Sequence, residues 1–356
     1  MVEKLRVAVL GATGIVGQRF VARLSRHPWF ELEALYASPE KAGYRYGDVV
    51  EWVIDEEPRE DVWEMRLRKL RVEDVAREGF DLVFSALSSS VAAAVEAELA
   101  RLGARIVSNA SPYRMERDIP LLNPEVNADH AVLVEKQARR GWRGWIAKVP
   151  NCSTAILTLA LKPVHDKYRI KRVMVATMQA VSGAGLRGVP ATMITDNIIP
   201  HIPGEEEKLA RETRKILGRL RNNEITQADM TVTAITTRVP VLDGHLEAVF
   251  IEVEETPQTP QEVAATLEEY RGNKIKNLKL PTAPQKPVIV KHEENRPQPR
   301  LDRNAGDGMT VTAGRIKIDQ ENNTIKMIIL GHNTIRGAAG TGILIGELMH
   351  KQGHTN

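Results

Sequence analysis

The feature that most constrains the fold lies at the start of the chain, where a short apolar strand runs through three glycines into an amphipathic helix. Residues 5–10 read LRVAVL, and Gly11, Gly14 and Gly17 follow at intervals of three in GATGIVGQRF. Such glycines let the backbone turn sharply and approach a pyrophosphate, which the N–H groups and the positive dipole end of the next helix stabilise. The motif alone is weak evidence, but both flanks are present, so the sequence favours a dinucleotide-binding unit over an ordinary tight turn.

Strands and helices alternate through the first 150 residues. The helix after the glycines has Phe20, Val21 and Leu24 on its apolar face, and Pro28 follows where it should end. Further predicted elements are strands at 31–38, 80–87 and 105–111 and a helix at 90–103. This alternation predicts a parallel, doubly wound sheet of the Rossmann type.

The pattern changes after Cys152 to long strands. Residues 230–241 and 245–255 form a predicted pair, because Leu242-Asp243-Gly244 between them is a strong hairpin signal. Segment 281–304 is rich in proline and charge, which is typical of an extended loop or arm. The other predicted elements are a strand at 172–181 and helices at 155–167, 205–220, 260–270 and 338–350.

The length and this change of pattern predict an α/β chain of two domains. Residues 1–150, completed by a C-terminal helix at 335–356, are expected to form the nucleotide-binding domain on a Rossmann-type doubly wound parallel sheet. Residues 151–334 are expected to form an α+β domain with a mixed sheet.

The composition excludes several classes of function. The longest apolar runs are too short or too interrupted for the ~20-residue span of a membrane, and no secretory signal pattern opens the chain, so we expect a cytoplasmic protein. A single cysteine rules out an intramolecular disulfide, and the 9 His residues show no tight metal-binding spacing, so no metal is expected. The net charge is only +3 and the basic residues are interleaved with acidic ones, which argues against a nucleic-acid partner.

The end of the second predicted strand indicates which dinucleotide is bound. NAD enzymes usually place an acidic residue there to hold the ribose 2′-hydroxyl, whereas this chain reads LYASPEKAG, with Ser38 at the strand end and Lys41 nearby. Neutral and basic groups suit a 2′-phosphate, so NADP is preferred. Glu40 weakens this preference, and a merely solvated turn is the alternative.

The only cysteine, Cys152, lies in the stretch VPNCST. A lone cysteine is more often a small buried apolar residue than a nucleophile. Here, however, Asn, Ser and Thr are favoured helix caps, and apolar residues recur behind them with helical spacing. Cys152 is therefore expected at a helix N-terminus, where the dipole stabilises a thiolate and lowers the pKa of the thiol.

A nucleophilic cysteine beside a nicotinamide suggests a specific chemistry. Thiolate attack on an aldehyde gives a thiohemiacetal, hydride loss to NADP gives a thioester, and phosphate or another nucleophile releases the product. His245 is the best candidate for the base, and Arg238 lies across the predicted hairpin from it. A strand-end histidine and a surface arginine are the equally weighted alternative.

Seven blocks of sequence carry a family resemblance. In chain order they are GATGIVGQRF, SNASPYRM, VPNCSTAILTLALKPV, QAVSGAGLRGV, IPGEEEKLARETRKILG, RVPVLDGHLEAVFIE and GHNTIRGAAGTGILIGELM. Together they resemble aspartate-β-semialdehyde dehydrogenase, especially the branch known from archaea and fungi, and they extend from residue 11 to residue 349.

The resemblance implies a role for each of several residues. Cys152 is the nucleophile, His245 the acid/base and Gln179 a group that positions the acyl intermediate. The implied substrate groups are Arg238 for the carboxylate, Glu205 for the ammonium, Lys208 and Arg114 for phosphate, and Asn151 in the same pocket. The implied cofactor groups are Gly11, Thr13, Gly14, Ile15 and Val16 at the pyrophosphate, Ser38 at the 2′-phosphate, and Ser182, Gly183 and Asn333 near the nicotinamide.

Glu205 is chosen among three consecutive glutamates. It stands one helical turn before Lys208, so the two can share a face. A solvated helix start is the alternative for both residues, because acidic side chains commonly occupy first turns.

The activity that the resemblance implies is the NADPH-dependent reductive dephosphorylation of L-aspartyl-4-phosphate to the semialdehyde and phosphate, in lysine, methionine and threonine biosynthesis. It also implies a homodimer or homotetramer assembled through the second, catalytic domain. A malonyl-CoA reductase on the same scaffold is the main alternative, and N-acetylglutamyl-phosphate reductase is a more distant one. A non-catalytic NADP-binding sensor is the alternative of another class.

Overall fold

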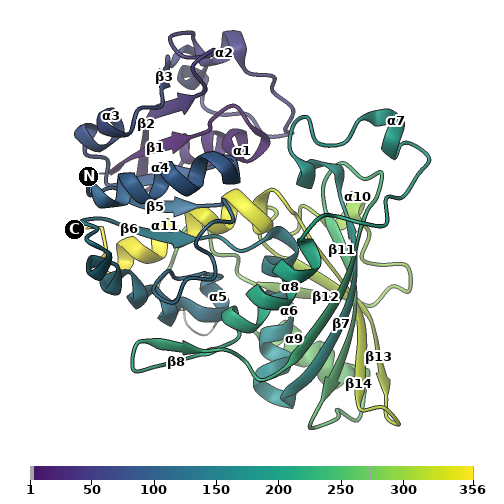
Figure 1. Cartoon of the computed structure of the whole chain (residues 1–356). Helices are drawn as coiled ribbons and strands as arrows, with labels where there is room; N and C mark the ends of the chain where they lie inside the picture. Colours follow the sequence, from purple (N-terminus) through teal and green to yellow (C-terminus); the bar gives the residue numbers. More distant parts are fainter. Residues whose placement is uncertain (1–3, 273–274, 356) are drawn as a thin grey trace.

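Two six-stranded sheets organise the chain in a computed structural model that describes residues 4–272 and 275–355 (Figure 1). The first sheet has the strand order β3-β2-β1-β4-β5-β6, and every neighbouring pair in it is parallel. Its strands are β1 (Leu5–Leu10), β2 (Phe30–Ala37), β3 (Leu67–Lys69), β4 (Leu82–Ser85), β5 (Arg105–Ser108) and β6 (Trp145–Lys148). The predicted Rossmann-type doubly wound sheet is confirmed.

Helices cover both faces of this sheet because its side chains alternate. Val7 and Val9 of β1 point into a core shared with α1 (Ile15–Leu24) and α11 (Gly340–Lys351). Ala8 and Leu10 point to the opposite side, into a core shared with α3 (Val72–Glu78) and α4 (Ser89–Arg101). The C-terminal helix thus packs beside α1. Residues 1–3 and 356 of the predicted first domain lie outside the described residues.

The second sheet is mixed, as predicted, with the order β10-β7-β11-β14-β13-β12. The pairs β10–β7 and β12–β13 are parallel and the others are antiparallel. Its strands are β7 (Ile170–Gln179), β10 (Thr231–Arg238), β11 (His245–Val253), β12 (Val288–Lys291), β13 (Val311–Asp319) and β14 (Thr324–Gly331). One face packs on α6 (Cys152–Tyr168), α8 (Glu205–Ile216) and α9 (Pro260–Glu269) in a single apolar core.

The predicted hairpin between residues 230–241 and 245–255 is wrong, because β7 lies between β10 and β11. The connection 239–244 crosses the end of β7, where Val239 N–H donates to Gln179 O at 3.0 Å and Val181 N–H donates to Val241 O at 2.8 Å. A turn signal shows where the chain bends but not which strand lies alongside. Arg238 and His245 nevertheless lie at the same end of the sheet, as the predicted hairpin implied, because β10 ends where β11 begins.

Two further expectations need correction. Segment 281–304 is no simple arm, because it contains edge strand β12 and the short helix α10 (Pro299–Asp302). The helix predicted over 205–220 ends at Ile216, after which the chain makes a two-stranded ribbon, β8 (Arg219–Arg221) and β9 (Glu224–Thr226). The remaining elements are α2 (Tyr46–Val49), α5 (Pro124–Asn127), α7 (Ala191–Ile194), the 3-10 turns Glu60–Glu64, Ala128–Arg140 and Val181–Ala184, and the π-turn Ile335–Ala339.

A fully buried ion pair connects the π-turn before the C-terminal helix α11 to the short helix α5. Arg336 Nη2 lies 2.5 Å from Glu125 Oε1, and Arg336 Nε donates to Met309 O at 2.7 Å. The guanidinium and the carboxylate are thus each satisfied inside the protein.

No helix among the described residues is long and apolar enough to cross a membrane.

Glu125→Gln should lower the free energy of unfolding by about 3–5 kcal/mol, because it leaves the buried Arg336 cation without its counter-charge. Urea denaturation measures this change. Glu98→Gln is the matched control, since it removes a solvent-exposed pair with Arg101 and should leave the free energy of unfolding almost unchanged. Equal effects of the two substitutions would contradict the structural role given to the buried pair.

Candidate active site

Three strand ends meet at one edge of the second sheet and carry polar side chains. Gln179 ends β7 and Arg238 ends the parallel strand β10, where the two residues are paired in register. His245 begins the antiparallel strand β11 on the other side of β7. All three side chains are buried. Strand direction therefore gathers three predicted site residues that are far apart in sequence.

Cys152 is brought to this edge as the first residue of α6, as the sequence predicts. Asn151 caps the helix, because its Oδ1 accepts from the N–H groups of Ser153 at 3.0 Å and Thr154 at 3.3 Å. The cap fixes the start of the helix and hence the position of the sulfur. Gly337 lets the π-turn that contains it pack closely against Cys152, since a Cβ on residue 337 would lie 2.6 Å from the Cβ of Cys152.

The sulfur of Cys152 lies 3.1 Å from Nε2 of His245. On the other side of the ring, the N–H of Ala180 donates to Nδ1 at 3.0 Å. Because Nδ1 is an acceptor, the neutral imidazole carries its proton on Nε2, facing the sulfur. His245 is thus arranged as a hydrogen-bond donor toward Cys152.

Glu205 at the start of α8 is held next to this pair. Its Oε1 accepts from Asn151 Nδ2 at 2.7 Å and from Gln179 Nε2 at 3.2 Å, and Lys208 Nζ lies 3.8 Å from Oε2. Glu206 instead accepts from the N–H of Thr236, and the next glutamate in the run is exposed. Glu205 is therefore the one of the three that faces the cysteine.

Arg238 supplies the opposite charge. Its Nη1 donates to Ala180 O at 2.8 Å, and the guanidinium raises no steric conflict because residue 183 is glycine. A Cβ at Gly183 would lie 2.7 Å from Arg238 Nη1 and 3.1 Å from His245 Cε1. A side chain at residue 183 would therefore crowd both Arg238 and His245.

Burial and charge set the protonation states of the resting site. Cys152 is half-buried, and the protein packed around its sulfur, together with the nearby Glu205 carboxylate, raises the pKa of the thiol to about 12, although Arg238 opposes the shift. Burial and the Arg238 charge hold the pKa of His245 well below its ordinary value. The expected lowering of the cysteine pKa by the helix dipole is thus outweighed, and the resting pair is a neutral thiol and a neutral imidazole.

A second carboxyl group lies behind the site on β11. Glu247 is fully buried, and Ser153 is a polar side chain beside it that favours the charged form of the carboxyl group. Burial and the neighbouring Glu205 outweigh this contact and raise the pKa of Glu247 well above its ordinary value. Burial therefore favours the neutral form of Glu247, whereas Glu205 is the carboxylate whose charge acts on Cys152.

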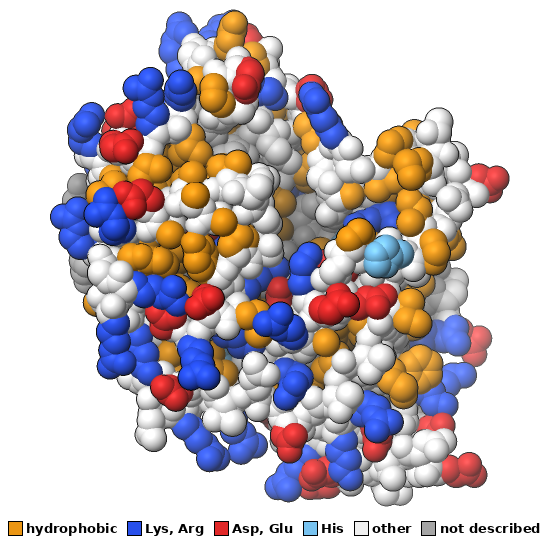
Figure 2. All heavy atoms as spheres, viewed as in Figure 1, with side chains coloured by type: hydrophobic (Ala, Val, Ile, Leu, Met, Phe, Trp, Pro, Cys, Tyr) orange, Lys and Arg blue, Asp and Glu red, His pale blue; other side chains and the backbone are white. Residues whose placement is uncertain are grey.

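A cavity of about 560 Å³ opens in front of Cys152, and the surface in Figure 2 is hollowed between the first sheet's unit and the segment that carries α7. The cavity brings together many of the predicted residues, namely Gly14, Ile15, Val16, Arg114, Asn151, Cys152, Ser182, Gly183 and Asn333.

The remaining predicted residues lie outside this lining. Gly11 and Thr13 are in the turn behind Gly14, and Ser38 is exposed one residue beyond the end of β2. A hydrogen bond from Ser38 lowers the pKa of the exposed Glu40 carboxyl, so an acidic group does lie beside the predicted 2′-phosphate position. Lys208 is partly exposed at the edge of the site.

The glycine turn fits a dinucleotide. Gly11 has φ +78°, and a Cβ on it would lie 2.8 Å from Ala86 O. No side chain caps the N-terminus of α1 among the described residues, so its first N–H groups can donate to a pyrophosphate. These are the groups that would hold the cofactor.

Two polar residues of the site were missed from the sequence. Glu212 accepts from Arg114 Nη1 at 2.9 Å and from the N–H of Asn151 at 2.7 Å, so it fixes both residues and offsets the charge of Arg114. Its spacing of seven from Glu205 places both on one helix face, and this was the available signal. Asn109 lines the cavity and its buried Nδ2 lacks a partner among the described residues, which leaves a donor for a ligand.

A dinucleotide-binding sheet whose cavity ends at a cysteine–histidine pair defines the class of nicotinamide-dependent dehydrogenases that act through a thioester. Family profiles agree: "Semialdehyde dehydrogenase, NAD binding domain" matches residues 6–133 and "Semialdehyde dehydrogenase, dimerisation domain" matches residues 161–336. The chain belongs to the aspartate-semialdehyde dehydrogenase family.

Full-length relatives support this assignment. The aspartate-semialdehyde dehydrogenase of Methanothermobacter thermautotrophicus is 49% identical over 98% of this chain and 99% of the relative, and that of Archaeoglobus fulgidus is 48% identical over 97% and 98%. The crystal structure of the Candida albicans enzyme with NADP superposes with a TM-score of 0.88 at 39% identity, covering 98% of this chain and 99% of that one. A malonyl CoA reductase (NADP) of Metallosphaera sedula is 35% identical over 99% of this chain and 98% of its own length.

Glu205→Gln should make the Cys152 thiol more acidic, because it removes the carboxylate that disfavours the thiolate. The pH profile of iodoacetamide alkylation of the free protein should therefore shift to lower pH, with a tenfold change in thiolate for each unit of pKa. Glu207→Gln, on the same helix but exposed, should leave the profile in place. A profile of Glu205→Gln that is unchanged or shifted to higher pH would contradict this electrostatic account.

Proposed function

We propose that the chain reduces L-aspartyl-4-phosphate to L-aspartate 4-semialdehyde and phosphate with NADPH, reversibly, in lysine, methionine and threonine biosynthesis. The observation that carries the proposal is the 3.1 Å contact of Cys152 Sγ with His245 Nε2, flanked by the Glu205 carboxylate and the Arg238 guanidinium. An amino acid carries one ammonium and one carboxylate, and these two side chains match them in charge.

The sulfur of Cys152 attacks the acyl carbon while the thiol proton passes to the departing phosphate, so that the bond from carbon to the phosphate oxygen breaks and a thioester forms. NADPH, when bound, supplies the hydride to that carbon. The Nε2–H of His245 donates to the oxygen that gains negative charge, and the C–S bond then breaks to release the aldehyde and a thiolate, which takes up a proton from solvent. Binding of the substrate ammonium at Glu205 offsets the charge that raises the thiol pKa in the resting site.

Substrate recognition follows from the same arrangement. We assign Arg238 to the substrate carboxylate and Glu205 to its ammonium, with Gln179 and Asn151 holding Glu205 in place. Lys208 and Arg114 are assigned to the phosphate group. The cavity wall, with Gly14 and its neighbours at one end and Ser182, Gly183 and Asn333 at the other, supports the assignment of these residues to NADP; Gly11, Thr13 and Ser38 complete that set.

We also propose that the protein is a homodimer or homotetramer assembled through the second sheet. The face of this sheet opposite α6 exposes large apolar side chains on three neighbouring strands, with Met174 42%, Phe250 41% and Ile235 60% exposed.

Blue and red side chains are interspersed over the face seen in Figure 2, which supports the expectation of no nucleic-acid partner. The domain boundary near residue 150 and a cytoplasmic location stay predictions of the sequence.

Cys152→Ser should abolish nearly all phosphate-dependent reduction of NADP by aspartate semialdehyde, while NADP binding is retained. His245→Ala should lower the rate on the order of 10² to 10⁴-fold. Steady-state kinetics and cofactor fluorescence measure the two properties. Substantial turnover by Cys152→Ser would refute the thioester route.

Malonyl-CoA tests the main alternative. A CoA thioester lacks the ammonium that Glu205 would bind, so malonyl-CoA should oxidise NADPH far more slowly than aspartyl phosphate is reduced. Turnover of malonyl-CoA without any reaction of the semialdehyde would show that the alternative is correct.

A further inference from the structure

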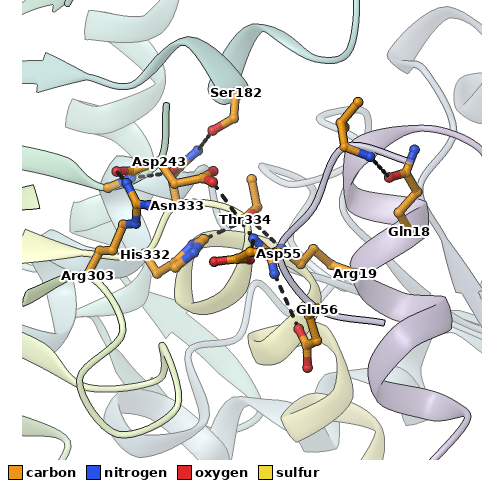
Figure 3. Close-up of polar contacts among 12 residues, drawn as sticks. Gln18, Arg19, Asp55, Glu56, Ser182, Asp243, Arg303, His332, Asn333 and Thr334 are labelled. Carbon is orange, nitrogen blue, oxygen red and sulfur yellow. Dashed lines mark hydrogen bonds and ion pairs between the residues drawn. The ribbon is translucent and has the colours of Figure 1, made fainter. Parts of the chain in front are cut away.

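Arg19 lies in the first helix after the glycine turn, yet its side chain reaches residues 239–244, which connect β10 to His245 and are called the catalytic loop below. It is 1% exposed, and its guanidinium lies 2.7 Å from Asp55, 3.3 Å from Glu56 and 3.8 Å from Asp243. Its Nε donates to Thr334 Oγ1 at 3.1 Å (Figure 3). One buried cation thus joins α1 to two segments of the second predicted domain, namely the catalytic loop and the turn that follows β14.

Asp243 is the second residue before His245, and its surroundings fix the loop on several sides. The N–H of Gly244 donates to Asn333 Oδ1 at 2.8 Å, and Arg303 donates to Asp243 O at 3.2 Å. Asn333 Nδ2 in turn donates to Ser182 Oγ at 2.7 Å (Figure 3). The side chain of Asp243 is the part of this loop that reaches α1.

Arg19 is the charged residue of α1 that contacts Asp243, and its basic neighbours do not share this role. His332 is buried beside Thr334, and burial lowers its pKa to about 4, so it is neutral near pH 7. Arg23, one turn further along α1, contacts Glu56 at 3.1 Å and Asp307 at 3.0 Å. Among the described residues, no ion pair joins Arg23 to Asp243, so Arg23 offers a matched comparison.

We propose that Arg19 is a positioning residue that ties the catalytic loop to the helix whose first turn faces the cofactor. Through Asp243 it sets where His245 stands relative to Cys152, so the alignment of the catalytic pair depends on the position of α1. The inference rests on the proposed function in that the reaction at Cys152 uses a dinucleotide held by this helix. A displacement of about 1 Å in a reacting group can cost on the order of 10²-fold in rate.

A double-mutant cycle in kcat tests the link. Arg19→Gln and Asp243→Asn should each lower kcat on the order of tenfold, and the double variant should be no slower than the slower single variant, because Asp243→Asn removes an interaction that Arg19→Gln already removes. Arg23→Gln loses a comparable number of ion pairs on the same helix and should stay within about twofold of the parent. Losses that multiply, or equal effects of Arg19→Gln and Arg23→Gln, would overturn the proposal.

Alkylation of Cys152 gives a readout that needs no substrate. Arg19→Gln should react with iodoacetamide on the order of threefold more slowly than Arg23→Gln, because the Nε2–H of His245 no longer stabilises the thiolate as well. In a His245→Ala background, Arg19→Gln should cause no further change. A persisting effect there would show that Arg19 acts on the fold at large and not through His245.

Two possible complications are covered by these measurements. If the parent protein fails to turn over the semialdehyde, the proposed function fails, whereas the alkylation comparison still decides the role of Arg19. If Arg19→Gln does not fold, Arg19→Lys replaces it: lysine keeps the charge but cannot span the same carboxylates, so it should show the same loss in alkylation rate.

Discussion

The rest of the site depends on one carboxylate, Glu205, to which Asn151 and Gln179 donate. Burial raises the pKa of the Cys152 thiol, the charge of Glu205 adds to this shift, and Arg238 acts against it. The same Asn151 caps the helix that presents the sulfur, so the position of the nucleophile and the orientation of the carboxylate are fixed by one amide. The free protein thus holds an unreactive thiol, and a ligand that brings a cation to Glu205 changes this balance. In the proposed function, the substrate ammonium is that cation, so substrate binding also activates the nucleophile.

Sequence reasoning succeeded where a local pattern determines the structure. The glycine turn, the alternation of strands and helices through the first 150 residues and the start of a helix at Cys152 each depend on neighbouring residues, and all three were predicted. The pairing of β10 with β11 was wrong because pairing depends on which distant strand fits alongside, and the strand that intervenes is coded more than 50 residues earlier in the chain. The lowered cysteine pKa was expected from the helix dipole alone, and the burial that outweighs it depends on packing between segments far apart in the chain.

Two of the residues that sequence reasoning missed, Glu212 and Arg19, act behind those that it found. Glu212 has no contact that a local motif would reveal, yet it holds Arg114 and the backbone of Asn151. Arg19 looked like an ordinary polar position on an amphipathic helix, but it is buried against a loop more than 200 residues away. Such residues are recognised only once the sheets are placed relative to each other, because their role lies in contacts between distant segments.

The placement of β7 between β10 and β11 has a consequence for how the chain folds. Thr231 pairs with Arg172 across a long loop, and the three strand ends around Cys152 come together only when this non-local pairing is complete. Closing such loops costs entropy before the contacts form, so sheets of this kind assemble slowly. The surroundings that raise the pKa of the half-buried Cys152 thiol are therefore complete only when this pairing is, and a chain that has not yet folded leaves its only cysteine open to oxidation.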